Sequence, residues 1–273
     1  MQLVDIGANL THAAFRDDVA EVVERARRAG VATIIVTGTT VEESRAALEL
    51  ATRFDNLHCT AGVHPHHARD CGPGTIAQLR EIADQPRVVA IGECGLDFNR
   101  NYSPHPDQEK WFVAQLELGL ELGKPLFLHS RDAHPRFSQI LHSLKPGKAV
   151  AHCFTGGKEE LHAYLELGLY IGITGWICDE RRGRHLAELA REIPPDRLLL
   201  ETDSPYLTPR DLRPQPRARR NEPAFLPHIL RAVARAAGRE PEQLAAETTR
   251  NAQAFFGIHE PGSSARAQRP LAA

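Results

Sequence analysis

Short apolar segments alternate with amphipathic stretches of helical periodicity along nearly the whole sequence. Strands and helices differ in the period of their apolar residues, and the two periods recur here in turn. A strand followed by a helix, repeated eight times in about 250 residues, forms a closed parallel barrel. The pattern therefore predicts an α/β protein with a single (β/α)₈ TIM barrel. The predicted strands span residues 3–9, 32–37, 57–63, 88–92, 125–129, 149–153, 169–173 and 197–202.

The helical stretches between these strands support one barrel rather than two domains. An open, doubly wound sheet is the competing architecture, but no Gly-x-Gly-x-x-Gly motif follows the first strand. No linker divides the chain, so we expect one barrel domain over residues 1–258 and a disordered tail, rich in Gly, Ser, Pro and Arg, over 259–273. The predicted helices span residues 17–29, 41–53, 75–85, 106–122, 133–144, 158–167, 183–191 and 224–237.

Composition narrows the class of protein further. With 42% hydrophobic and 25% charged residues, the chain has the composition of a soluble enzyme, and its net charge of −2 gives no overall attraction for polyanions. No apolar run approaches the roughly 20 residues of a membrane-spanning helix, and the first residues do not resemble a secretory signal. The five cysteines form no Cys-x-x-Cys pair, which favours a reducing compartment. We therefore expect a cytoplasmic protein without membrane association.

Side chains that bind metal ions recur at the ends of the predicted strands. In a TIM barrel the carboxyl ends of the strands meet at one mouth, where functional residues gather. Ligands far apart in sequence would thus converge in space, and a mixture of imidazole and carboxylate groups favours a catalytic metal centre with open positions. The residues at these strand ends are His64 and His66, Glu93, His129, His152 and Asp203.

Longer motifs surround these residues and resemble a known family. They are GVHPH at 62–66, IGECGLDF at 91–98, LHSRDA at 128–133, AHCFTG at 151–156, ITGWICDERRG at 173–183 and the segment 198–230, which begins LLLETDSPYLTPRD. These motifs resemble the TatD family of metal-dependent deoxyribonucleases, and the resemblance extends from the first strand to Phe256-Gly257. It implies a (β/α)₈ barrel with 3′→5′ exonuclease activity on single-stranded DNA, with RNA as a further substrate.

The resemblance also implies roles for the residues at the strand ends. Glu93, His129, His152 and Asp203 would bind a divalent metal, with Mg²⁺ expected from the family; a site with two histidines would also take Mn²⁺ or Zn²⁺. A metal ion lowers the pKa of bound water, which then attacks the phosphodiester. Asp203 is the expected proton acceptor, with Glu93 beside it in the catalytic set. His64, or His66 instead, would hold a phosphate oxygen or protonate the leaving 3′ oxygen.

The first strand departs from the pattern of many family members. Those members carry Asp-x-His-x-His there, whereas this chain has Asp5-Ile6-Gly7-Ala8-Asn9 and shares the Asp-Ile-Gly-x-Asn-Leu-Thr opening of another branch. Gly7 has no side chain to bind a metal, and Asn9 offers only an amide oxygen. We therefore expect a single well-bound metal, with a second one arriving weakly or with the substrate.

Basic and aromatic residues near the predicted mouth are candidates for substrate binding. A phosphodiester needs positive charge at its non-bridging oxygens, and the loop after the eighth strand is long, rich in proline and basic. An alternative interpretation is a solvated basic loop without function. Trp176, Tyr206 and Tyr102 are either stacking platforms for bases or packing residues. The candidate phosphate-binding residues are His66, Arg131, Arg181, Arg182, Arg210, Arg213, Arg217, Arg219 and Arg220.

Two other functions remain open on the sequence. The same metal site could hydrolyse a different bond, as in amidohydrolase-like barrels or in deacylation of D-aminoacyl-tRNA. The chain could also be a non-catalytic scaffold that binds metal or nucleic acid, because the first-strand histidines are missing. The arginine-rich last loop favours a polyanionic substrate, single-stranded DNA or RNA, and we expect the protein to be a monomer.

Overall fold

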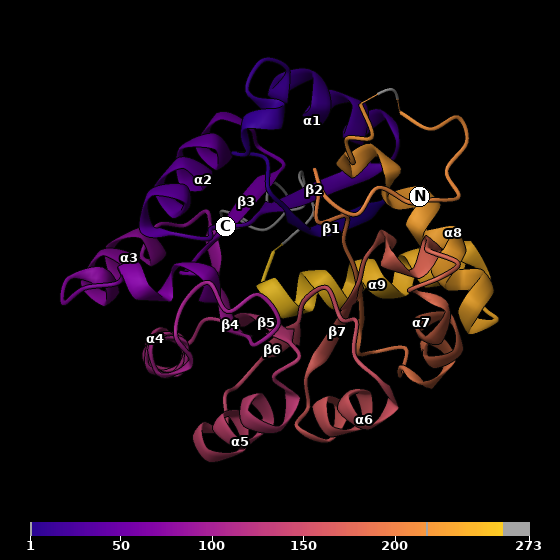
Figure 1. Cartoon of the computed structure of the whole chain (residues 1–273). Coiled ribbons are helices and arrows are strands. Elements are labelled where there is room, and N and C mark those ends of the chain that lie inside the picture. Colours follow the sequence, from indigo (N-terminus) through magenta and orange to yellow (C-terminus); the bar gives the residue numbers. More distant parts are fainter. Residues whose placement is uncertain (1, 217, 259–273) are drawn as a thin grey trace, which may run out of the picture.

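The computed structural model describes residues 2–216 and 218–258, and in these residues it contains the predicted barrel. Eight strands form one parallel sheet in sequence order, each paired with the next along the chain. The helices surround the strands (Figure 1). The strands are β1 (Leu3–Ala8), β2 (Val31–Val36), β3 (Leu57–Ala61), β4 (Val88–Asp97), β5 (Leu126–Arg131), β6 (Ala149–Ala151), β7 (Tyr170–Ile173) and β8 (Leu198–Leu200).

The sheet closes between its first and last strands. The backbone N–H of Asp203 donates to the carbonyl of Gly7 at 2.8 Å, and the N–H of Asn9 donates to the carbonyl of Ser204 at 2.7 Å. Ala8 and Ser204 form a parallel bridge there. These bonds leave no open sheet edge at the carboxyl ends of β1 and β8, so the prediction of a (β/α)₈ barrel is confirmed.

The helices cover the outside of the barrel with their apolar faces turned inward. In α1, for example, Val22, Val23 and Ala26 are buried at the spacing of one helix face. The helices are α1 (Val19–Arg28), α2 (Val41–Arg53), α3 (Thr75–Ala83), α4 (His105–Leu122), α5 (His134–Leu144), α6 (Lys158–Glu166), α7 (Arg184–Leu189), α8 (Leu226–Ala237) and α9 (Pro241–Phe256). Short 3₁₀ helices lie at Ala13–Phe15, Pro65–Asp70, Gly175–Cys178 (η3), Ala190–Glu192 and Pro223–Phe225.

Helix α9 was not predicted, and it has a distinct place in the barrel. Figure 1 shows it crossing the barrel rather than joining the outer ring of helices. Phe255 and Phe256 pack into the apolar cluster inside the strands, and Phe255 contacts the ring of Tyr170 at the beginning of β7. Lys148, just before β6, donates to the carbonyl of Ala254. Because these contacts lie at the amino ends of the strands, α9 closes the end of the barrel opposite the functional mouth.

Three further sequence predictions concern cysteines, membranes and the C-terminal end. All five cysteines are free, as predicted. Among the described residues, no helix is long and apolar enough to cross a membrane. The predicted tail, residues 259–273, lies outside the described residues, as does Arg217.

Candidate metal centre

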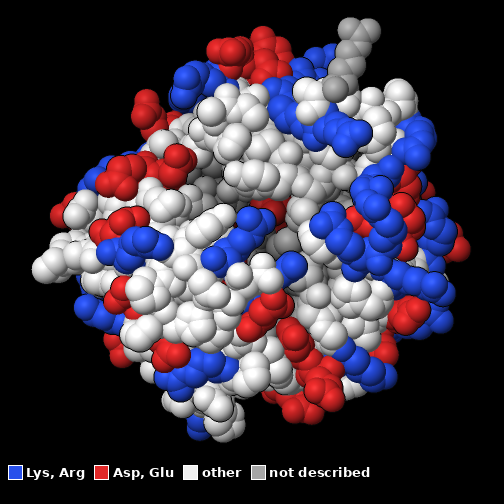
Figure 2. Space-filling view, viewed as in Figure 1, with Lys and Arg blue, Asp and Glu red and all other residues white. Residues whose placement is uncertain are grey.

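The carboxyl ends of the strands surround a cavity of about 640 Å³. Figure 2 shows a hollow at the centre of this face, with acidic atoms inside it and basic side chains at its edge. All residues of the predicted metal set line the cavity, together with both histidines of the GVHPH motif. The lining residues that the sequence predicted are His64, His66, Glu93, His129, Arg131, His152, Trp176, Arg182, Asp203 and Tyr206.

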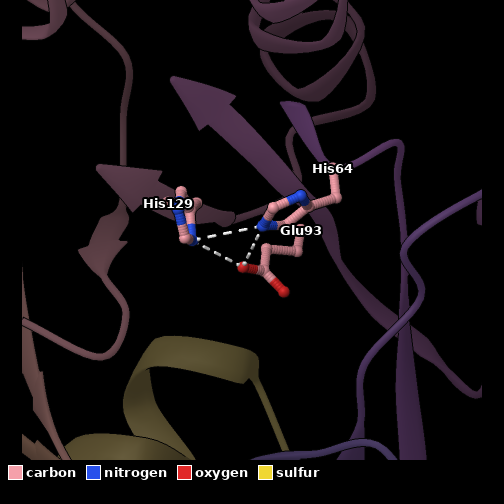
Figure 3. A group of neighbouring side chains, drawn as sticks. All are labelled: His64, Glu93 and His129. Carbon is pink, nitrogen blue, oxygen red and sulfur yellow. Dashed lines mark hydrogen bonds and ion pairs between the residues drawn. The ribbon is translucent and has the colours of Figure 1, made fainter. Parts of the chain in front are cut away.

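Glu93, in the middle of β4, is the centre of the histidine cluster. Its Oε1 atom lies 2.9 Å from Nδ1 of His129, and 3.3 Å from Nε2 of His64 and of His152. Figure 3 shows His64 and His129 pointing at this carboxylate. Burial alone would raise the pKa of Glu93, but the positive charge of His152 and its other imidazole contacts hold it well below its ordinary value. The cluster therefore combines a buried carboxylate with three imidazole groups, the donor types that divalent metal ions bind.

Asp203 lies on the other side of His152. One donor atom each from His152, Cys153 and Asp203 lies within 4.8 Å of the others. Burial raises the pKa of Asp203 to about 7, because the nearby His152 charge only partly offsets the loss of water and the repulsion by Glu93. Asp203 and Cys153 both have positive φ angles, 53° and 46°, a backbone conformation that is costly outside glycine and common at functional sites.

These donors fit a divalent metal ion. Glu93, His129, His152 and Asp203 supply two imidazoles and two carboxylates within one contiguous cluster. Nε2 of His129 is buried and makes no hydrogen bond, although Oδ2 of Asp97 is 3.4 Å away. Burial opposes a positive charge on His152, but the carboxylates of Glu201 and Glu93 raise its pKa well above the ordinary value. That all four side chains bind one ion stays a prediction.

Asp97 is a site residue that the sequence analysis missed. The prediction ended the fourth strand at residue 92, whereas β4 continues to Asp97. Its Oδ2 atom accepts a hydrogen bond from Nε2 of His66 at 2.7 Å, and its Oδ1 accepts the backbone N–H groups of Asn99 and Arg100. Residues 93, 95 and 97 share one face of a strand, so the two-residue period could have revealed it.

Glu201 was also missed, and it lies behind His152. It is fully buried; its Oε2 accepts a hydrogen bond from Nδ1 of His152 at 2.6 Å, and its Oε1 accepts the backbone N–H of Cys153. A carboxylate on the far nitrogen of a metal-binding histidine fixes the ring and raises its basicity. The hydrogen bond leaves Nε2 of His152 as the atom directed at Glu93. Glu201 is thus a positioning residue for His152.

The structure explains why the first-strand histidines are absent. A Cβ atom at Gly7 would lie 2.6 Å from Oε2 of Glu201 and 3.0 Å from Cζ of Phe127, so glycine leaves the space that the glutamate occupies. Nδ2 of Asn9 donates to Oδ1 of Asp203 at 2.9 Å. Gly7 thus adjoins Glu201, which bonds to His152, and Asn9 bonds to Asp203; that neither position binds a metal stays a prediction.

The predicted substrate-binding residues separate into two groups. His66 and Arg131 line the cavity, and the guanidinium of Arg131 lies over the ring of Trp176, as does that of Arg182. The lining also includes Arg100, which the sequence analysis did not single out.

Arg181, Arg210 and Arg220 do not line the cavity. Arg210 is near Asp179 and Glu180, and Arg181 is exposed beside Glu180. Arg220 pairs with Asp18 at 2.7 Å and with Glu222 at 2.6 Å. These pairs hold Arg220 beside the N-terminal end of α1 and not in the lining of the cavity, so its predicted contact with substrate gains no support from its position.

Metal-free protein is expected to lose stability as the pH rises from 6.5 to 8. Burial raises the pKa of Asp5 to about 8, although hydrogen bonds from Thr202 oppose this shift. Burial also raises the pKa of Asp203 to about 7. The folded state then binds protons that the unfolded chain releases, so stability falls with rising pH. The raised pKa of His152 acts in the same direction, whereas the lowered pKa of His64, about 4, acts oppositely only below pH 6.5.

Urea unfolding in excess chelator measures this effect. In Asp5→Asn, the free energy of unfolding should fall less steeply with pH, by up to about 1.4 kcal/mol per pH unit between pH 6.5 and 8. Equal slopes for Asp5→Asn and the wild-type protein would contradict the assignment of a buried, protonated Asp5.

A family model described as "TatD related DNase" matches residues 4–257. The chain belongs to the TatD family. Curated relatives named "3′-5′ ssDNA/RNA exonuclease TatD" include those of Erwinia amylovora (55% identical) and Klebsiella pneumoniae (53%). Each alignment covers 94% of this chain, and 100% and 98% of the relative.

Solved structures agree with this membership. A TatD family hydrolase from Entamoeba histolytica matches with a TM-score of 0.86, 26% identity and coverage of 94% of this chain and 98% of that chain. YJJV, a TatD homologue from Escherichia coli, matches with a TM-score of 0.87 at the same identity and coverage. The resemblance seen in the sequence motifs is therefore confirmed.

Proposed function

We propose that this TatD family protein is a metal-dependent 3′→5′ exonuclease that degrades single-stranded DNA and RNA. The observation that carries the proposal is the convergence of three imidazoles on Oε1 of Glu93, beside Asp203, in a cavity with arginine and tryptophan side chains in its wall. The names of relatives that are 51–55% identical support the polarity and both substrates.

Glu93, His129, His152 and Asp203 would hold the metal ion, with Mg²⁺ as the proposed activator. A bound divalent ion polarises the phosphodiester and lowers the pKa of water. Asp203 is suited to accept the proton from water, because burial raises its pKa to about 7, close to the working pH. Asn9 would orient this carboxylate through its hydrogen bond to Oδ1.

His64 is suited to donate a hydrogen bond rather than to bind the metal. Its Nδ1 atom accepts the backbone N–H of His66 at 3.1 Å, so the proton of the neutral ring lies on Nε2. Burial lowers the pKa of His64 to about 4, which keeps the ring neutral at pH 7. We propose that Nε2 donates to a non-bridging phosphate oxygen during the reaction. His66, aligned by Asp97, is the neighbouring donor.

Trp176 is the proposed platform for a base next to the cleaved phosphate. Arg131 and Arg182 lie 5.4 and 4.6 Å from its ring, so one surface combines an aromatic face with two positive charges. Stacking is tolerant of sequence because every base has an aromatic face, and positive charge compensates the phosphates. This combination suits a flexible single strand rather than a duplex.

Replacing Trp176 with alanine is expected to raise KM for single-stranded DNA about tenfold, because a stacked base contributes roughly 1–3 kcal/mol. Steady-state kinetics on a labelled oligonucleotide measure the change. Trp111→Ala is the matched control, since Trp111 lies on α4 and does not line the cavity. Equal KM values for the two variants would argue against stacking on Trp176.

Digestion of 5′-labelled and 3′-labelled single strands tests the function as a whole. With Mg²⁺ or Mn²⁺, a 3′→5′ exonuclease releases the 3′ label at once as a mononucleotide and shortens the 5′-labelled strand stepwise. Chelator should stop both reactions. Hydrolysis of D-aminoacyl-tRNA or amide substrates without cleavage of either strand would favour the alternative hydrolase. Cytoplasmic location and a monomeric state stay predictions.

A further inference from the structure

A second cluster of metal-binding side chains lies outside the cavity. One donor atom each from Cys178, Asp211 and His228 lies within 4.8 Å of the other two. None of the three lines the catalytic cavity. We propose that these residues form a second metal site, selective for zinc, that fastens the loop after β8 to the barrel. This inference does not depend on the nuclease activity.

The three donors come from separate parts of the chain. Cys178 ends η3 after β7, Asp211 lies in the long loop between β8 and α8, and His228 is in the first turns of α8. Nε2 of His228 lies 2.7 Å from Oδ1 of Asp211, and Sγ of Cys178 lies within 4.8 Å of a donor atom of each. A tetrahedral ion would separate the nitrogen and oxygen to about 3.3 Å, a small movement for an exposed aspartate.

The chemistry of the donors favours zinc over magnesium. A thiolate, an imidazole and a carboxylate are ordinary zinc ligands, whereas Mg²⁺ prefers oxygen atoms only. The Cys178 residue is only 6% exposed, while the side chains of His228 and Asp211 are 24% and 44% exposed. An ion can therefore reach the cluster from solvent, and water can complete the fourth position.

Cys178 lacks the properties of a nucleophilic cysteine. A nucleophilic cysteine reacts as the thiolate, so its thiol needs a lowered pKa. Burial and the negative charge of Asp211 raise the pKa of the thiol, which leaves it unreactive until a metal displaces its proton.

Occupation of this site would order the part of the mouth next to Trp176. Cys178 directly precedes Asp179, which pairs with Arg182 at 3.1 Å and lies 3.8 Å from Arg210. Arg210 directly precedes Asp211 in the loop. A metal ion bound by Cys178 and Asp211 would thus hold η3 and the loop together. Arg182, which lines the cavity, and Arg210 both lie next to this point.

Cobalt titration of the chelator-treated, full-length protein tests the site, because Co²⁺ bound to a thiolate gives an absorption band in the near ultraviolet. The Glu93→Ala background removes a ligand of the catalytic centre, so the signal reports this cluster. We expect one equivalent of Co²⁺ to produce the band and Zn²⁺ to displace it. Cys178→Ser should abolish the band, and His228→Gln should weaken Co²⁺ binding at least tenfold.

Cys153→Ser is the matched control, since Cys153 is the cysteine beside Asp203 in the catalytic cavity. The band should persist in this variant. His228→Gln and Asp211→Asn change exposed or half-buried side chains, so circular dichroism should show them folded even if Cys178→Ser is not. Absence of the band in the Glu93→Ala protein would overturn the proposal. A band that survives Cys178→Ser and disappears in Cys153→Ser would do so as well.

Discussion

Replacing Glu93 with alanine should reduce kcat/KM on single-stranded DNA by about 10³-fold or more at saturating Mg²⁺, a loss of about 4 kcal/mol of transition-state stabilisation. Glu93 is the carboxylate on which His64, His129 and His152 converge, and no neighbouring side chain shares this position. Without it, the three imidazoles lose the carboxylate that they share, and the proposed metal ion loses a ligand. Asp203→Asn should cause a loss of similar size, because it removes the proposed proton acceptor.

The loss of activity in Glu93→Ala must come from the missing carboxylate in the site and not from unfolding of the protein. Burial of the Glu93 charge is costly on its own, so the alanine variant should unfold at a temperature no more than a few degrees below that of the wild-type protein. Glu121→Ala, on the exposed side of α4, is the control for the same substitution away from the cavity. A turnover rate within tenfold of wild type in both Glu93→Ala and Asp203→Asn would contradict the mechanism proposed for this site.

Gly7→Ala is expected to damage the site although Gly7 has no side chain. The added Cβ would lie 2.6 Å from Oε2 of Glu201, which is fully buried and bonded to His152. Either the strand or the glutamate must move, at a cost of about 1–3 kcal/mol in stability. Disturbing a carboxylate that supports a metal ligand typically weakens metal affinity 10–100-fold. Isothermal titration with Mn²⁺ and urea unfolding measure the two effects.

A double substitution shows whether Gly7→Ala weakens Mn²⁺ affinity by displacing Glu201. If Gly7→Ala acts by displacing this glutamate, adding it to Glu201→Ala should weaken Mn²⁺ affinity little beyond the loss caused by Glu201→Ala alone. Gly147→Ala is the matched control, because nothing lies within 4 Å of a Cβ at that position. Additive losses of affinity in the double variant would mean that Gly7 and Glu201 act separately.

The barrel was predictable because its signals are local. Each strand has its own apolar run and each helix its own amphipathic period, and the number of units specified the architecture. The metal-binding candidates were predictable for a related reason: carboxyl ends of parallel strands meet at one mouth, so Glu93, His129, His152 and Asp203 had to approach each other. Helix α9 was missed because the eight-unit pattern is complete before it begins.

Residues that act through other residues were not predictable in the same way. Glu201 and Asn9 have roles defined by the atoms they hold, which belong to other strands and loops. Arg220 shows the opposite case. Its position in a basic loop predicted contact with substrate, but Asp18 and Glu222 hold it outside the cavity. The direction of a long side chain depends on neighbours that a linear pattern does not identify.

Residue type and spacing were enough to predict the eight strand–helix units, the family and the positions of the candidate ligands along the chain. The three-dimensional fold established that Glu93 lies at the centre of the imidazole cluster, that Glu201 aligns His152 and that Gly7 leaves space for Glu201. It also brought Cys178, Asp211 and His228 together. The physical reason is that hydrogen bonds and metal coordination require atoms within a few ångströms, and closure of the barrel alone sets those distances.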